Sequence, residues 1–116
     1  MGLDIKPGQA LRLLHRNAMV QSQHPGSDLT ARQTAILLTI YLDPPPHTVR
    51  GLAQKLQVAK PVVTRALDSM GRMNLLERQR DPNDLRNVLI RRTVEGSLFV
   101  SEMADRLVSE AEALGR

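Results

Sequence analysis

Hydrophobic positions recur every three or four residues in five segments of the chain, which is the spacing of an amphipathic helix. They predict helices over residues 7–21, 29–42, 48–56, 60–73 and 93–114. The first two of these segments are followed by stretches that contain proline, which interrupts helices, and the third is followed by a tight connection. The connecting stretches are QSQHPGSD (21–28), DPPPH (43–47) and QVA (57–59).

Residues suited to helix ends support these boundaries. Thr30 is followed three residues later by Gln33, the spacing of a capping box. Thr48 is a candidate cap for the short third helix, and Pro61 suits the first turn of the fourth. Asn74 can end that fourth helix in the left-handed conformation.

Two strand-like segments, LLERQR (75–80) and NVLIRR (87–92), are joined by the turn residues DPNDLR (81–86). A short helix, a tight turn, a second helix and a hairpin in this order predict a winged helix-turn-helix with a two-stranded β wing. The fold class is mainly α (α+β), in a single domain over 1–116. Its parts are an N-terminal helix and loop (1–28), a core (29–92) with the wing at 75–92, and a C-terminal helix (93–116).

Composition excludes several kinds of site. Tyr41 and Phe99 are the only aromatic residues, so the core must be aliphatic. Without cysteine the chain has no disulfide, thiolate metal site or cysteine nucleophile. The three histidines lack metal-ligand spacing. No serine lies in a nucleophile elbow, and the sequence contains no glycine-rich phosphate loop. We expect no enzymatic activity and no cofactor.

No apolar run is long enough to span a membrane, and the first residues lack the pattern of a secretory signal. These features predict a cytoplasmic protein without a membrane partner. Charge is unevenly distributed, because residues 60–92 carry eight Lys/Arg and four Asp/Glu, whereas residues 93–116 carry two and five. A local basic excess in a chain of pI 10.3 indicates a polyanionic partner.

The run LTARQTAILLTI, then TVRGLAQKLQVAKPVVTRALDSM, the D-x-R of DLR and the RRTVEG junction together resemble the MarR family of bacterial transcription regulators over about residues 29–100. The resemblance implies a homodimer that acts as a repressor on a pseudo-palindromic operator in double-stranded DNA. It also implies a recognition helix in the major groove, a wing arginine in the minor groove and control by a small-molecule effector, often an aromatic anion. Ala59 and Asn74 stand where the family commonly has serine and glycine, and only one C-terminal helix fits where the family has two.

The inward stripe Val63, Ala66, Leu67 and Met70 leaves the other face of helix 60–73 for DNA. Arg65 suits a bidentate contact to guanine, and Val62 suits a thymine methyl. Thr64 suits either a thymine methyl or a phosphate, and Lys60 suits a phosphate. In the wing, Arg86 suits a narrow minor groove, and Asp84 can hold its guanidinium in a planar pair. The predicted DNA-contacting residues are Lys60, Pro61, Val62, Thr64, Arg65, Arg72, Arg78, Arg80, Asp84 and Arg86. Arg91 and Arg92, at the base of the hairpin, are weaker phosphate candidates.

The last helix carries an apolar stripe with a period close to 3.5, which the first helix or a partner subunit must cover. Residues 3–20 and the last helix are therefore the expected dimer contact. The predicted dimerisation residues are Leu11, Leu14, Val100, Met103, Leu107, Ala111 and Leu114. The alternative to a DNA-binding regulator is a winged-helix module for protein association, which uses the same fold without needing a basic outer face.

Overall fold

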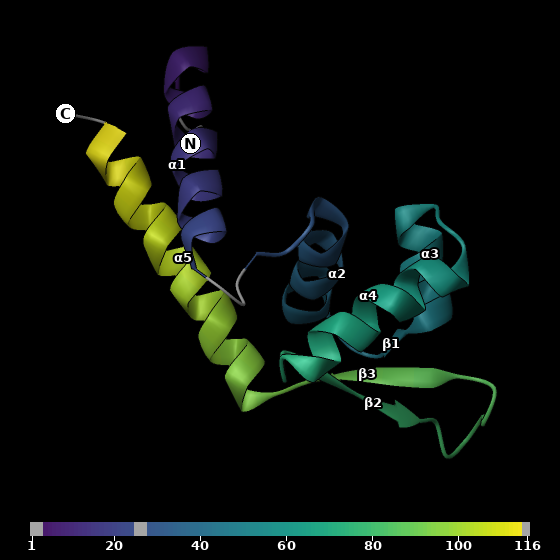
Figure 1. The fold of residues 1–116 in the computed structure, drawn as a ribbon. Helices are drawn as coiled ribbons and strands as arrows, with labels where there is room; N and C mark the ends of the chain where they lie inside the picture. The colour runs from purple at the N-terminus through teal and green to yellow at the C-terminus, as the bar shows by residue number, and fades with distance from the viewer. Residues whose placement is uncertain (1–3, 25–27, 115–116) are drawn as a thin grey trace. The chain divides into compact units, whose positions relative to one another are not determined.

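The computed structural model describes residues 4–24 and 28–114, and its contacts divide the chain into two compact units. Residues 29–100 form the core unit, and residues 1–28 with 101–116 form the helical pair. Residues 25–27 of the predicted loop and residue 3 of the predicted dimer segment lie outside the described residues. The elements of the chain are drawn in Figure 1.

Three helices form the core unit together with a hairpin and the start of the last helix. They are α2 (Ala31–Leu42), α3 (Val49–Leu56) and α4 (Lys60–Arg72). The predicted capping box is confirmed, because Thr30 Oγ1 accepts a hydrogen bond from the Gln33 backbone N–H at 3.1 Å and Gln33 Oε1 accepts one from the Thr30 N–H at 2.9 Å. Because Thr30 is the cap, α2 begins at Ala31 and not at Leu29, which is buried in the core instead.

The turn between α3 and α4 and the end of α4 also follow from the cap residues. Thr48 Oγ1 accepts from the Gly51 N–H at 3.0 Å, which confirms it as the cap of α3. Gln57 ends α3 in the left-handed conformation with φ 56°. Asn74 has φ 60°, as predicted for the residue that stops the next helix.

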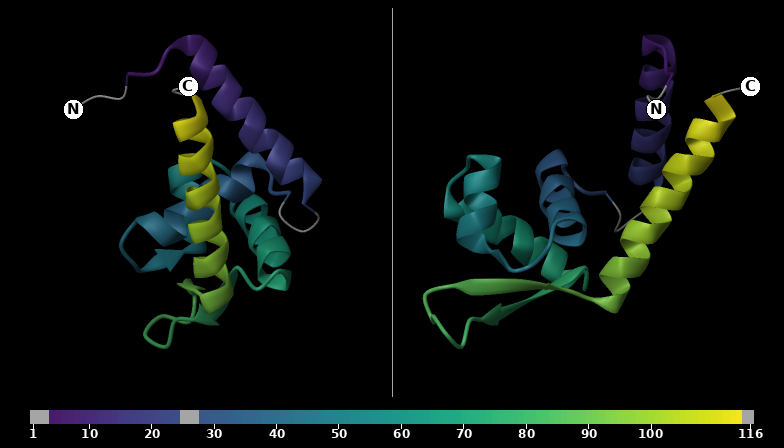
Figure 2. Two further views of the ribbon diagram at one scale, coloured as in Figure 1. Left: turned by 90° about the vertical axis from the view of Figure 1, so that its left-hand side faces the viewer. Right: turned by 180° about the vertical axis from the view of Figure 1, so that it is seen from behind.

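The sheet has three strands, which corrects the prediction of a two-stranded wing. β2 (Leu76–Arg80) and β3 (Val88–Arg92) form the predicted hairpin, and β1 (His47–Thr48) pairs antiparallel with the other edge of β3. His47 lies opposite Ile90 and Thr48 opposite Leu89. A two-residue strand is too short to leave an alternating pattern in the sequence, so only the long-range pairing reveals it. The hairpin extends as an arm whose tip stands clear of the helices of the core unit (Figures 1 and 2).

The core is aliphatic, as predicted. Its buried residues come from α2, α3, α4, the sheet and the adjoining Leu29 and Leu75. The largest fully buried side chains are Ile36, Leu37, Ile40, Leu52, Val63, Leu67 and Met70. Tyr41 and Phe99 are partly buried against this cluster. The predicted inner stripe of α4 is therefore confirmed, and its burial fixes which side of α4 remains outside.

A single hydroxyl ties the base of the hairpin to α2. Tyr41 donates to the Leu75 carbonyl at 2.7 Å and accepts from the Thr93 N–H at 3.0 Å. Thr93 Oγ1 in turn caps α5 (Val94–Leu114) by accepting from the Gly96 N–H at 2.9 Å. Gly96 packs directly against the Tyr41 hydroxyl and the Leu75 carbonyl. The start of α5 is thereby anchored to the core unit at the point where β3 ends.

The helical pair consists of α1 (Pro7–Gln23) and residues 101–114 of α5. α1 runs two residues further than predicted, and none of its residues is buried. Gln9 Nε2 donates to the Leu114 carbonyl at 3.3 Å, joining the start of α1 to the end of α5. Both helices keep large apolar side chains on their surface.

Candidate nucleic-acid interface

Burial of one face of α4 leaves its predicted DNA-contacting residues at the surface. Lys60, Pro61, Arg65 and Arg72 are exposed, and Val62 and Thr64 are half-buried. Ala59 gives α4 no side-chain cap, and Pro61 contributes no N–H to the first turn. Arg65 lies on the helix surface without a hydrogen-bond or ion-pair partner among the described residues, so its five donors are available to a ligand.

The wing tip presents Arg86 in a fixed geometry. Its Nε donates to Asp84 Oδ1 at 3.0 Å and its Nη2 to Asp84 Oδ2 at 3.1 Å, which confirms the predicted planar pair. This hydrogen bonding to Arg86 holds the pKa of Asp84 below its ordinary value of 3.8 and raises the pKa of Arg86. The Arg86 side chain nevertheless remains 83% exposed, so the pair orients Arg86 without covering it.

Two other arginines that were predicted to contact DNA bind to groups of the protein itself. Arg78 Nη1 on β2 lies 2.7 Å from Asp68 Oδ1 on the outer face of α4. Arg80 Nη1 donates to the Leu85 carbonyl across the tip at 2.6 Å. The ion pair joins the wing to α4 and neutralises the negative charge of Asp68 on the outer face of that helix. The hydrogen bond from Arg80 restrains the backbone of the wing tip.

A hollow of about 210 Å³ lies between the start of α4 and the wing. It brings together three predicted residues, Lys60, Thr64 and Arg86, and adds Arg50 of α3. A second hollow of about 240 Å³ on another part of the α4 surface is lined by Arg65 and Val62 and adds Arg32 of α2. Each hollow thus combines α4 residues with a cation from the first turn of another helix.

Sequence reasoning missed Arg32 and Arg50. Each follows a capping threonine by two residues, Thr30 in one case and Thr48 in the other. The repeated T-x-R spacing was a usable signal, because a cap threonine places the next two residues at the start of a helix. Only the packing of α2 and α3 against α4 shows that both arginines border the same helix.

Arg92, one of the weaker phosphate candidates, is hydrogen-bonded within the protein. Its Nε donates to the Ile40 carbonyl at 2.8 Å and its Nη2 to the Asp43 carbonyl at 3.0 Å. Its guanidinium also lies 5.7 Å from the Tyr41 ring centroid, a cation–π distance. Arg92 therefore satisfies carbonyls that the end of α2 leaves free, while Arg91 is exposed without a partner among the described residues.

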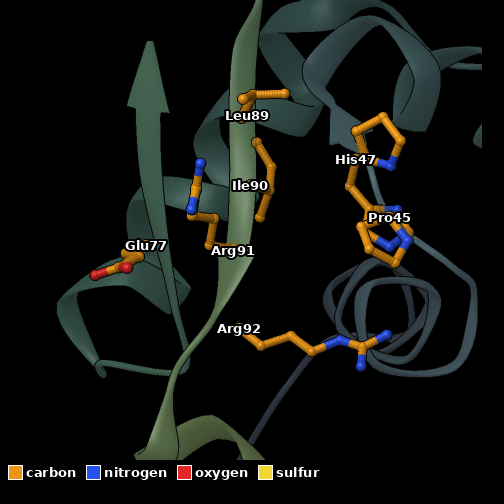
Figure 3. Close-up of a pocket in the computed structure, with 8 residues that line it drawn as sticks. Pro45, His47, Glu77, Leu89, Ile90, Arg91 and Arg92 are labelled. Carbon is orange, nitrogen blue, oxygen red and sulfur yellow. The ribbon is translucent and has the colours of Figure 1, made fainter. Parts of the chain in front are cut away.

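A further hollow of the core unit, about 530 Å³, borders β3 and the proline segment before β1 (Figure 3). Its lining residues are Pro45, Pro46, His47, Glu77, Leu89, Ile90, Arg91 and Arg92. None of the ten residues predicted to contact DNA lines it. His47 is buried, with its Nε2 3.1 Å from the Asp43 carbonyl, so its ring is part of the scaffold.

Six of the seven predicted dimerisation residues lie on the helical pair, and Val100 belongs to the core unit. Leu11 and Leu14 are each 67% exposed on α1, and Leu107 is 42% exposed on α5. Ala111 is also exposed, and Met103 and Leu114 are half-buried. Val100 instead packs against the core unit. None of the helices in the described part of the chain has both the length and the apolar composition of a membrane span.

A tight α3–α4 turn, a β hairpin beside α4 and cations on the outer side of α4 define a winged helix-turn-helix protein of the DNA-binding class. Comparison with known proteins agrees. A sequence model described as the MarR family matches residues 29–88, which is more than half of the chain. The chain therefore belongs to the MarR family of transcriptional regulators.

Solved structures show the same fold. The regulator Tm0710 from Thermotoga maritima is 26% identical with a TM-score of 0.68, covering 92% of this chain and 76% of that one. A point mutant of MepR from S. aureus, bound to an oligodeoxyribonucleotide, is 23% identical with a TM-score of 0.77, covering 90% and 75%. PcaV from Streptomyces coelicolor, in complex with its natural ligand, is 24% identical with a TM-score of 0.65, covering 97% and 80%. A comparison with curated protein sequences found no match.

Proposed function

We propose that this regulator is a non-enzymatic repressor that binds a pseudo-palindromic operator in double-stranded DNA as a homodimer. α4 enters the major groove, where Arg65 contacts guanine O6 and N7. Arg86 enters the adjacent minor groove, whose negative potential is strongest over A·T-rich sequence. The observation that carries this proposal is the placement of exposed Arg65 on α4 and of Arg86 on a wing tip that projects beyond the helices of the core unit.

The remaining cations supply contacts to the phosphate backbone. Lys60 and Arg50 border the same hollow as Arg86, and Arg32 borders the hollow next to Arg65. Such contacts set affinity and position on the duplex without reading sequence. The fold match to MepR, which was solved with an oligodeoxyribonucleotide, supports the same mode of docking for this chain.

Selection of bound sites from random duplexes tests the function directly. Recovery of an inverted repeat with half-sites about 34–36 Å apart along the helix supports a dimer with one α4 in each major groove. Two results together would contradict DNA binding and favour a protein-association module: the selection enriches no site, and duplex affinity does not fall with added salt.

Two substitutions separate the roles of the arginines. Arg65→Ala is expected to cost about 1–3 kcal/mol on the selected site and to relax the choice of one base pair. Arg86→Ala is expected to weaken binding to cognate and scrambled duplexes more evenly and to lower the salt slope by about one. Lys55→Ala, which removes an equal charge from the last turn of α3, where Lys55 pairs with Asp43 at 2.9 Å, is the control.

The dimer contact proposed is the helical pair. One recognition helix reads too few base pairs for useful specificity, and exposed leucines on α1 and α5 need cover. Leu11, Leu14 and Leu107 are the residues assigned to that contact. Light scattering at micromolar concentration should show a dimer, and Leu14→Asp should shift it toward monomer. A monomeric wild-type protein would contradict this part of the proposal.

Control by a small ligand completes the proposed function. PcaV shares this fold and was solved with its natural ligand, and the resemblance to the family implies an effector that is often an aromatic anion. A panel of small aromatic carboxylates added to the protein–operator complex should contain a compound that releases the duplex. Duplex affinity that no compound of the panel changes would contradict an effector of this class.

A further inference from the structure

Leu85 is a large apolar residue at the centre of an otherwise polar wing tip. It lies between Asp84 and Arg86, the two members of the planar pair, and 63% of its surface is exposed. One exposed leucine is ordinary on a protein surface and needs no functional explanation. What sets Leu85 apart is its position next to the arginine that the proposed function places in the minor groove.

The tip backbone is held in one shape by local hydrogen bonds. The Asp84 N–H donates to the Asp81 carbonyl at 3.2 Å, and the Asn87 N–H donates to the Asp84 carbonyl at 2.9 Å. Asp81 Oδ1 accepts from the Asn83 N–H at 2.9 Å. The tip is closed where the Asp81 N–H donates to the Asn87 carbonyl at 3.0 Å.

The peptide group that follows Leu85 is held at both of its polar atoms. Its carbonyl accepts the 2.6 Å hydrogen bond from Arg80 Nη1 on β2. The next N–H, that of Arg86, donates to Asp84 Oδ1 at 3.1 Å. A loop whose backbone is already ordered loses little backbone freedom on binding, so the tip presents Leu85 without first having to order itself.

We propose that Leu85 is a specificity-determining residue, which packs against the sugars and floor of the minor groove when Arg86 enters it. This inference rests on the proposed function. In the minor groove a G·C pair differs from an A·T pair by the guanine N2 amino group, a hydrogen-bond donor. An apolar side chain at that position obstructs the amino group and offers it no acceptor. Leucine is among the apolar residues that minor-groove-binding proteins insert from this groove.

Three operator duplexes test the contact. They carry A·T, G·C or inosine·C pairs under the wing and are otherwise identical to the selected site. Inosine·C presents the major groove of G·C without the minor-groove amino group. Wild type is expected to bind the A·T and inosine·C duplexes about tenfold more tightly than the G·C duplex, within the range that one unsuitable base pair costs.

Leu85→Ala keeps Arg86 and its partner but removes the apolar contact. It is expected to reduce the preference against G·C to about twofold, whereas Leu85→Gln, which adds a hydrogen-bonding group of similar size, should bind the G·C duplex as well as the other two. Leu42→Ala deletes the same side chain at a 73% exposed position on α2 and should keep the wild-type preference. Thermal melting checks that each variant is folded.

The outcomes separate the proposed function from the role of Leu85. A wild type that binds none of the duplexes refutes the proposed function. A wild type that binds, with Leu85→Ala keeping the full preference against G·C, overturns the role of Leu85 and leaves the preference to Arg86. A loss of preference in Leu42→Ala equal to that in Leu85→Ala also overturns it, because the effect is then not local to the tip.

Discussion

Replacing Gly96 by alanine is expected to destabilise the core unit strongly. A Cβ atom at this position overlaps the Tyr41 hydroxyl oxygen and the Leu75 carbonyl oxygen, and lies 2.8 Å from Tyr41 Cζ. The Leu75 oxygen is backbone, so it cannot turn away as the end of a flexible side chain can. The tyrosine ring can move only by giving up its hydrogen bonds to Leu75 and Thr93.

The size of the effect follows from these contacts. Forcing an extra methyl group into a packed site costs about 1–3 kcal/mol. Moving the hydroxyl away leaves a partly buried Thr93 N–H without its partner, which costs about 1–3 kcal/mol. The better helix propensity of alanine returns about 1 kcal/mol. We expect a net loss of about 1–5 kcal/mol, centred on about 3 kcal/mol, a large part of the roughly 5–15 kcal/mol that stabilises a typical domain.

Urea unfolding and thermal melting measure this loss, with Gly71→Ala as the matched control. Gly71 is also helical, in α4, and a Cβ there meets nothing within 4 Å. Gly71→Ala should therefore raise stability by up to about 1 kcal/mol. Gly96→Ala should lower the melting temperature by about 10 °C or more. Equal melting temperatures for the two variants would refute the steric reasoning.

Four further predictions concern single groups. Tyr41→Phe should destabilise the protein by about 1–3 kcal/mol in urea unfolding, because it removes the acceptor of the Thr93 N–H; no change would contradict the anchoring role. Thr30→Ala should cost about 1 kcal/mol in the same assay, as loss of a helix cap does, whereas Thr30→Ser should not. NMR titration should give Asp84 a pKa below 3.8, so its pair with Arg86 is present above that pH and is lost as the pH falls through the lowered value; Arg86→Gln should return the pKa toward 3.8. Asp68→Asn should release Arg78, strengthen duplex binding and increase the salt slope by about one; weaker binding would indicate that Asp68 itself contacts the bases.

Elements whose signals are local in the chain could be predicted from the sequence. Thr30 with Gln33, Thr48 and Asn74 marked helix ends through residues that lie close together in the chain. The apolar spacing of α4 identified its buried face, and therefore which side Arg65 occupies. The Asp84–Arg86 pair could also be predicted, because only one residue separates its members in the sequence.

Features that depend on distant parts of the chain could not be predicted. β1 exists because His47 meets Ile90, which lies far along the chain, and two residues show no periodicity. Arg92 binds carbonyls at the end of α2, and Arg78 binds Asp68 of α4. In the sequence, every arginine of a predicted strand could be either unpaired or bound within the protein. Only the folded structure shows which guanidinium groups already have partners.

The presence of a single tyrosine and no tryptophan has a practical consequence for spectroscopy. Intrinsic ultraviolet emission from this protein arises almost wholly from Tyr41, whose phenol is bonded to Leu75 and Thr93. A change in that emission on adding duplex or ligand would therefore report on one known place, the junction of α2, β3 and α5. The chain carries its own site-specific optical probe without any label.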